Sequence, residues 1–235
     1  MDVNYAIPFM SKDWIVANTL SLIYFISIMG IGKILSKKNR IIFIKYFVYL
    51  FITSYIIYHY LHIVGGTWSI DKRLPFHLCG FSSVITCFIL FIKKKQLWFD
   101  FLFYAGILGG LNALLTPLID NYTGTNFFYV EYFYSHTSII ILPLYMYYYM
   151  DMDLSKLSWL KSFIALNILL VFLMPLDFYI DANYMYLKEP PAVNHPLVSG
   201  KWPYYLINLE FVVVILLYFT YSLFKSPLFT NKKMV

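Results

Sequence analysis

Residues 14–35 read WIVANTLSLIYFISIMGIGKIL, a stretch in which Lys33 is the only charged side chain. A helix needs about 20 predominantly apolar residues to cross the hydrocarbon core of a bilayer. Buried strands run only about four to eight residues, so the length favours a spanning helix. The chain opens with Asp2 in place of a basic region, and the apolar run is too long for a signal peptide. We therefore expect this stretch to stay as the first membrane span.

The composition indicates that the remaining chain follows the same plan. Of its 235 residues, 60% are hydrophobic and only 13% are charged, against about a quarter charged in soluble domains. We expect an all-α polytopic integral membrane helix bundle, a single transmembrane domain over residues 1–235 with about seven spanning helices. The expected spans are 14–35, 41–64, 75–92, 97–118, 128–150, 157–180 and 203–224.

The net charge of +6 is explained by membrane topology. Lys and Arg residues gather in alternate loops, around 33–45, 93–95 and 156–161, and in the tail at 225–233. Cytoplasmic loops carry such an excess of basic residues, so we expect the N-terminus outside and the C-terminus inside. The basic residues are scattered through short loops, and a nucleic-acid partner would need a clustered basic surface. We expect no nucleic-acid partner.

Two cysteines, Cys79 and Cys87, fall on the same expected helix. Eight helical residues place them about 12 Å apart, whereas a disulfide needs Cα atoms within about 7 Å, so we expect free thiols. Pro75 favours the first turn of a helix, so Cys79 should lie where the positive end of the helix dipole favours a thiolate. His77 or His136 would then be its base, although a buried structural cysteine explains the pattern nearly as well.

Polar residues inside the expected spans gather near the outer face of the membrane. Such groups are costly in lipid and mark functional sites or helix contacts. The residues are His59, His62, His77, Cys79, Asn112, Thr116, His136, Asp177 and Glu210. For each of them a structural role, at the lipid headgroups, at a helix end or between helices, stays open.

The longest outer loop, residues 181–202, is rich in proline and aromatic side chains. It includes Asn183 and Tyr184, then Pro190 and Pro191. This composition predicts an ordered cap over the outer helix ends, able to exclude water from a site beneath it. A plain interfacial loop is the alternative.

Several short motifs occur together in a fixed order along the chain. They are Leu74-Pro75-Phe76-His77-Leu78-Cys79, residues 109–117 (GGLNALLTP), His136, residues 183–187 (NYMYL) and residues 200–203 (GKWP). Over residues 41–225 the chain resembles the YwaF-type bacterial integral membrane proteins, which are related to the animal transmembrane protein 164 family. The resemblance implies several spanning helices and a cysteine-dependent acyltransferase that remodels phospholipid acyl chains. Cys79 is similar to the proposed nucleophile of that family, with His77 and His136 as its accompanying histidines.

Three functions are compatible with these residues. In the first, Cys79 transfers an acyl chain between membrane lipids with His77 or His136 as base, and no cofactor or metal is needed. Residues expected to bind substrate or stabilise the oxyanion are Asn112, Thr116, Asn183, Tyr184 and Glu210.

The second function is a metal-dependent membrane hydrolase. His59, His62, His77 and His136, with Asp177 or Glu210, would supply its ligands. The third is transport or lipid binding without catalysis, in which His136, Asp177 and Glu210 would relay protons or bind substrate. In every case we expect a multi-pass protein of the cell membrane, and the sequence leaves its oligomeric state open.

Overall fold

A computed structural model of the chain describes residues 5–119, 126–190 and 201–227. These residues form seven α-helices, a short 3-10 helix and a two-stranded antiparallel pair in which Tyr5 is opposite Ile119 and Ala6 opposite Leu118. The all-α prediction is confirmed apart from this small strand pair. The elements are β1 (Tyr5–Ala6), α1 (Lys12–Ile34), α2 (Lys37–Val64), α3 (Leu78–Phe88), α4 (Gln96–Leu115), β2 (Leu118–Ile119), α5 (Asn126–Tyr149), α6 (Ser158–Tyr179), η1 (Tyr184–Tyr186) and α7 (Tyr204–Lys225).

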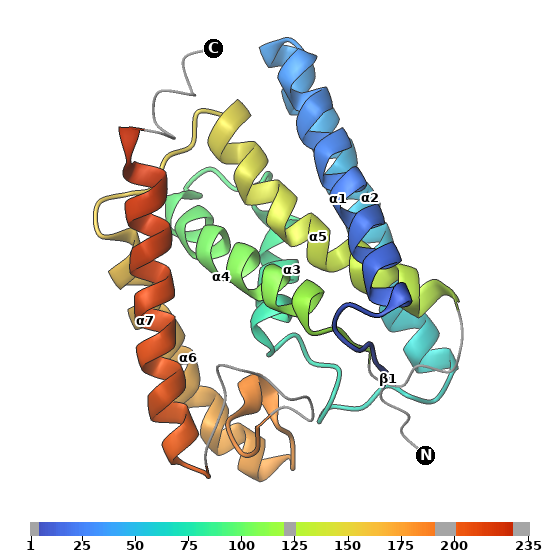
Figure 1. Ribbon diagram of the computed structural model, residues 1–235, viewed down its shortest axis with the longest axis vertical. Coiled ribbons are helices and arrows are strands. Elements are labelled where there is room, and N and C mark those ends of the chain that lie inside the picture. Colours follow the sequence, from blue (N-terminus) through green and yellow to red (C-terminus); the bar gives the residue numbers. More distant parts are fainter. Residues whose placement is uncertain (1–4, 120–125, 191–200, 228–235) are drawn as a thin grey trace.

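Helices α4 and α5 form the centre of the bundle (Figure 1). Helices α1 and α2 pack on α5, whereas α6 and α7 pack on α4 and on each other, so the central pair has outer helices on both sides. The short α3 contacts α2, α4 and α5 and fills the interior beside them. Helix α3 thus lies among three longer helices, and the residues at its start, Leu78 to Gly80, are half-buried.

Glycines on α4 explain why the central helices approach so closely. A Cβ atom placed on Gly106 would lie 2.5 Å from the carbonyl oxygen of Ile139, and one on Gly110 would lie 2.7 Å from that of His136. The two glycines are four residues apart and so share one helix face. Small residues at this spacing let membrane helices pack backbone to backbone, which no larger residue would permit here.

Five helices are long and apolar enough to cross a membrane, namely α1, α2, α4, α6 and α7. Few side chains of α1, α2, α6 and α7 are buried, whereas those of α4 are mostly buried. Water is a poor solvent for such an apolar exterior, and lipid is the environment that suits it. Helix α5 is as long as these helices, but its tyrosines, Glu131 and His136 make it less apolar, in keeping with its central position.

Helix α3 is shorter than the span expected over residues 75–92. It has 11 residues, so it is about 16 Å long at 1.5 Å per residue, roughly half of a hydrocarbon core. Residues 74–77 form a turn before it, in which the Phe76 N–H donates to the Leu74 carbonyl. A Cβ on Gly80 would come within 2.8 Å of the Pro75 backbone, so this turn lies directly against the helix start.

Candidate functional site

Cys79 is the second residue of α3. His77, in extended conformation, is the N-cap residue, but its side chain makes no capping hydrogen bond. Within the described part of the chain, the N–H groups of Leu78, Cys79 and Gly80 make no hydrogen bond that the structure shows. The first turn of a helix leaves such donors open. The Cys79 thiol therefore lies beside free backbone donors at the positive end of a helix dipole.

The thiol of Cys79 packs against α4 at a pair of adjacent glycines. A Cβ on Gly109 would lie 3.2 Å from Cys79 Sγ, and Gly110 meets the backbone of His136 on α5. The same short stretch of α4 thus contacts both the cysteine of α3 and the histidine segment of α5. Within the described residues no hydrogen bond joins Cys79 to a histidine, and both cysteines are free thiols.

The hydrogen bond of His136 fixes the tautomer in which Nε2 is unprotonated and can accept a proton. Its Nδ1 lies 2.7 Å from the Tyr132 carbonyl oxygen, which can only accept, so Nδ1 carries the proton. Nε2 then presents its lone pair away from this contact. The Tyr132 ring lies 4.3 Å from the imidazole, centroid to centroid, and restricts its rotation.

His77 has the opposite arrangement. Its Nδ1 accepts a hydrogen bond from the Met185 N–H at 3.3 Å, so in the neutral ring Nε2 carries the proton. The ring also packs between Tyr184 and Tyr186, at 5.2 Å and 5.4 Å between centroids. His77 thus ties the start of α3 to the segment after α6, which makes it a poorer proton acceptor than His136.

Tyr184 is fully buried where the cap meets the turn before α3. Its hydroxyl donates to the Ile70 carbonyl at 2.7 Å and accepts from the Leu74 N–H at 2.9 Å. Burial raises the pKa of Tyr184 to about 12, so the hydroxyl keeps the proton that it donates. Its own N–H donates at 3.0 Å to Oδ1 of Asp177, a buried carboxylate in the last turn of α6.

Of the segment predicted to form a cap, residues 181–190, Lys201 and Trp202 lie within the described residues, and residues 191–200, including Gly200 of the GKWP motif, lie outside them. Asn183 holds this loop together. Its Oδ1 accepts from the N–H groups of Lys188 and Glu189, and its Nδ2 donates to the Glu189 carbonyl. Asn183 therefore shapes the loop, and these bonds occupy its amide.

Asn112 and Thr116 lie at the end of α4, where the Thr116 hydroxyl donates to the Asn112 carbonyl at 3.0 Å. This bond caps the helix end, and Asn112 is exposed. Glu210 lies elsewhere, between α6 and α7, and its Oε2 accepts from Asn167 Nδ2 at 3.1 Å. The described contacts of Glu210 are thus with α6 and not with the Cys79 segment.

The histidines of α2 form a separate aromatic cluster. His62 is buried, with Nδ1 2.7 Å from the Thr67 hydroxyl and its ring stacked on Phe128. His59 accepts from Trp68 Nε1 at 3.1 Å. In the described ranges no three His, Cys, Asp or Glu side chains are close enough to share a metal ion. The ligand set expected for a metal hydrolase is therefore not gathered among these residues.

Two buried charged residues were missed by the sequence analysis. Arg73, in the turn before α3, is buried and donates from Nη1 to the Tyr58 hydroxyl at 2.8 Å. Glu131 is buried on α5, within the expected span 128–150. A lone carboxylate in an apolar run is the signal that singled out Glu210, and it applies equally to Glu131. Arg73 gave no such signal because it lies in a loop.

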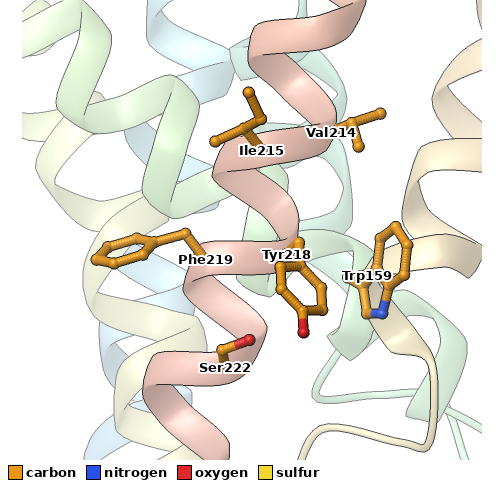
Figure 2. Close-up of a pocket in the computed structure, with 6 residues that line it drawn as sticks. All are labelled: Trp159, Val214, Ile215, Tyr218, Phe219 and Ser222. Atoms are coloured by element: carbon orange, nitrogen blue, oxygen red, sulfur yellow. The ribbon is translucent and has the colours of Figure 1, made fainter.

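Away from this region, the α6–α7 surface carries a shallow apolar groove. It has a volume of about 340 Å³ and is lined by Trp159 of α6 and by residues of α7 that include Tyr218 and Phe219. Figure 2 shows Trp159 beside Tyr218. The groove has almost no polar lining, so it offers no chemistry, and lipid chains suit such a surface.

Residues 9–221 of the chain match the model of the TMEM164 family. The chain belongs to the TMEM164 family. Comparisons with curated proteins and with solved structures find no match. The match covers all seven helices except the end of α7, and with five helices able to span it makes this TMEM164-family chain a multi-pass membrane protein.

Proposed function

We propose that this TMEM164-family chain is a membrane acyltransferase that exchanges phospholipid acyl chains through Cys79. The observation that carries the proposal is the position of Cys79 in the first turn of α3. There it packs on Gly109 and lies beside three backbone N–H groups that have no hydrogen-bond partner among the described residues. A nucleophile next to such donors is the arrangement that acyl transfer needs, because the same donors stabilise the oxyanion. The family resemblance supports the same residue.

The first half-reaction moves the acyl chain onto the enzyme. His136 Nε2 takes the Cys79 proton, and the sulfur attacks the ester carbonyl carbon of a phospholipid. The tetrahedral oxyanion accepts hydrogen bonds from the first-turn N–H groups of α3. The C–O bond then breaks, the lysophospholipid oxygen takes the proton from His136, and a thioester remains on Cys79.

The second half-reaction reverses these roles. The hydroxyl of an acceptor lysophospholipid gives its proton to His136 Nε2 and attacks the thioester carbonyl. The C–S bond breaks as the new ester forms, and Cys79 regains its proton from His136. No oxidant, metal or cofactor is needed for this balance.

Membrane topology completes the proposal. The excess of Lys and Arg in alternate loops supports an N-terminus outside and a C-terminus inside. The start of α3 would then face the outer leaflet, beneath the cap of residues 181–190, with Lys93, Lys94 and Lys95 on the opposite side. Membrane lipids would reach Cys79 from the bilayer, between the apolar outer helices.

The test is acyl transfer by purified protein in liposomes, with a phospholipid labelled in its acyl chain and an unlabelled lysophospholipid. Cys79→Ser should abolish transfer and the acyl adduct on the intact protein. Cys87→Ser is the matched control, since Cys87 is the other free thiol of the same helix, and it should transfer normally. Full transfer by Cys79→Ser would refute the mechanism.

A further inference from the structure

Three contacts join the segment after α6 to the segment that leads into α3. The Tyr184 hydroxyl bonds to both Ile70 and Leu74, and the Met185 N–H bonds to His77. The Tyr184 ring packs edge-on against Phe76 at 5.4 Å between centroids. All of these contacts fall on residues 70–77, directly before the helix turn that carries Cys79.

We propose that Tyr184 is a positioning residue for Cys79, held in place by Asp177, and that the Asp177–Tyr184 pair fixes the first turn of α3 for acyl transfer. The proposal rests on the acyl-transfer function above and deepens it. Tyr184 acts through the backbone of residues 70–77 and does not touch the reacting atoms.

The hydroxyl of Tyr184 is suited to this task because it is both donor and acceptor. Residues 70–77 form an irregular turn whose backbone groups have few partners within the turn itself. Tyr184 supplies an acceptor for the Leu74 N–H and a donor for the Ile70 carbonyl. Removing it leaves two backbone groups without these bonds, and such groups rearrange to find others. The first turn of α3 would shift with them.

Asp177 is suited to hold Tyr184. It is fully buried, its Oδ1 accepts the Tyr184 N–H, and its backbone carbonyl accepts the Ala182 N–H. Its Oδ2 makes no hydrogen bond that the described residues show. A buried carboxylate is costly at the C-terminal end of a helix. Asp177 is kept there because its Oδ1 accepts the Tyr184 N–H. The amide oxygen of an asparagine could accept the same hydrogen bond.

The backbone beyond Tyr184 is held in an unfavourable conformation. Met185 and Tyr186 have φ values of 52° and 58°, in the left-handed region that non-glycine residues avoid. Such strain persists only where surrounding contacts impose it. The bond from the Met185 N–H to His77 and the bond from the Tyr205 hydroxyl to the Tyr186 carbonyl are among the contacts that hold these two residues.

The experiment compares Tyr184→Phe, Asp177→Asn and Asp177→Val with the wild type in liposomes. Tyr184→Phe keeps the ring and removes both hydroxyl bonds, so kcat should fall roughly 10- to 100-fold with KM within about twofold. Asp177→Asn keeps an oxygen acceptor and should retain activity, whereas Asp177→Val should resemble Tyr184→Phe. Tyr179→Phe, at an exposed tyrosine two residues after Asp177, is the control and should be unchanged.

A second readout does not depend on acyl transfer. The rate at which a small maleimide alkylates Cys79 should change in Tyr184→Phe and Asp177→Val, with Cys87 unaffected. The proposal is overturned if kcat and Cys79 alkylation stay at wild-type values in Tyr184→Phe. It is also overturned if both cysteines change together as the protein loses its fold. A Cys79-specific change in a chain with no acyl transfer would support the positioning and refute the function.

Discussion

Gly110 of α4 lies so close to α5 that a Cβ atom placed on it would come within 2.7 Å of the carbonyl oxygen of His136. The neighbouring residue, Gly109, leaves the space that the Cys79 thiol occupies. Two consecutive glycines thus let α3 and α5 approach α4 at the same level. This close packing is how Cys79 on α3 and His136 on α5, the nucleophile and base proposed above, can act together although they are far apart in the sequence.

We expect Gly110→Ala to destabilise the protein by about 1–3 kcal/mol, because the added methyl meets a backbone oxygen and Ile140, and the backbone cannot yield cheaply. Thermal unfolding in detergent measures this change. Gly30→Ala on α1 is the matched control, since nothing lies within 4 Å of its Cβ position. Alanine should there be neutral or favourable by up to about 1 kcal/mol. Equal stability of the two variants would contradict the packing argument.

Apolar length was enough to predict the long helices, because a spanning segment is recognisable without its neighbours. It failed for α3. Residues 75–77 and 89–92 are mostly apolar, but the turn at Leu74–Phe76 and the contact of Gly80 with Pro75 delay the helix start to Leu78. Both contacts depend on the local backbone geometry around Pro75, which apolar length and periodicity do not contain.

At the candidate site, too, some residues could be predicted from the sequence and others could not. Cys79 and His136 stood out because thiols and imidazoles are few in this chain. The role of Tyr184 could not be predicted, since its partner Leu74 is 110 residues away and tyrosine occurs 23 times. Glu210 was grouped with the site by its depth in the membrane, yet its contact is with Asn167. Depth fixes a level in the bilayer but not a direction around the helix.

Replacing His77 and His136 with asparagine, one at a time, should have different effects on acyl transfer. An asparagine oxygen can replace His77 Nδ1 as acceptor for the Met185 N–H, so His77→Asn should keep most of the acyl-transfer activity. Asparagine has no basic nitrogen, so His136→Asn should lose roughly 10²- to 10⁴-fold in kcat. Single-turnover formation of the acyl adduct on Cys79 separates the two. The assignment of the base would be reversed if His77→Asn were the inactive variant.

Asp100 should matter for stability and not for chemistry. It is buried near the start of α4 and accepts hydrogen bonds from Gln96, from the Ser155 N–H and from the Ser155 hydroxyl. Asp100→Ala leaves these donors unmatched, and we expect a loss of about 2–4 kcal/mol in the free energy of unfolding. Activity per folded molecule should not change. An Asp100→Ala protein that unfolds at the wild-type temperature would show that this network contributes nothing.

The Tyr184 contacts should be lost only at strongly alkaline pH. Burial raises the pKa of Tyr184 from about 10 in the unfolded chain to about 12, so the protonated hydroxyl favours the folded state. Its contribution is complete below pH 10 and disappears as the pH rises from about 10 to about 12. The difference in Tm between wild type and Tyr184→Phe should therefore be constant from pH 6 to 10 and then shrink. A difference that disappears below pH 9 would contradict this account.

Glu210 separates acyl transfer from transport. Its Oε2 accepts from Asn167 between α6 and α7, a bond that Glu210→Gln can retain through the amide oxygen. If the protein transfers acyl chains at Cys79, Glu210→Gln should keep activity within about twofold, and Glu210→Leu should lose only about 0.5–1.5 kcal/mol of stability. A proton-coupled transporter that used Glu210 would instead lose its activity in Glu210→Gln, because the amide cannot carry the proton. Measuring acyl transfer and pH-gradient-driven lipid uptake in the same liposomes decides between them. Uptake that survives Cys79→Ser but fails in Glu210→Gln would replace the catalytic proposal with a transport function.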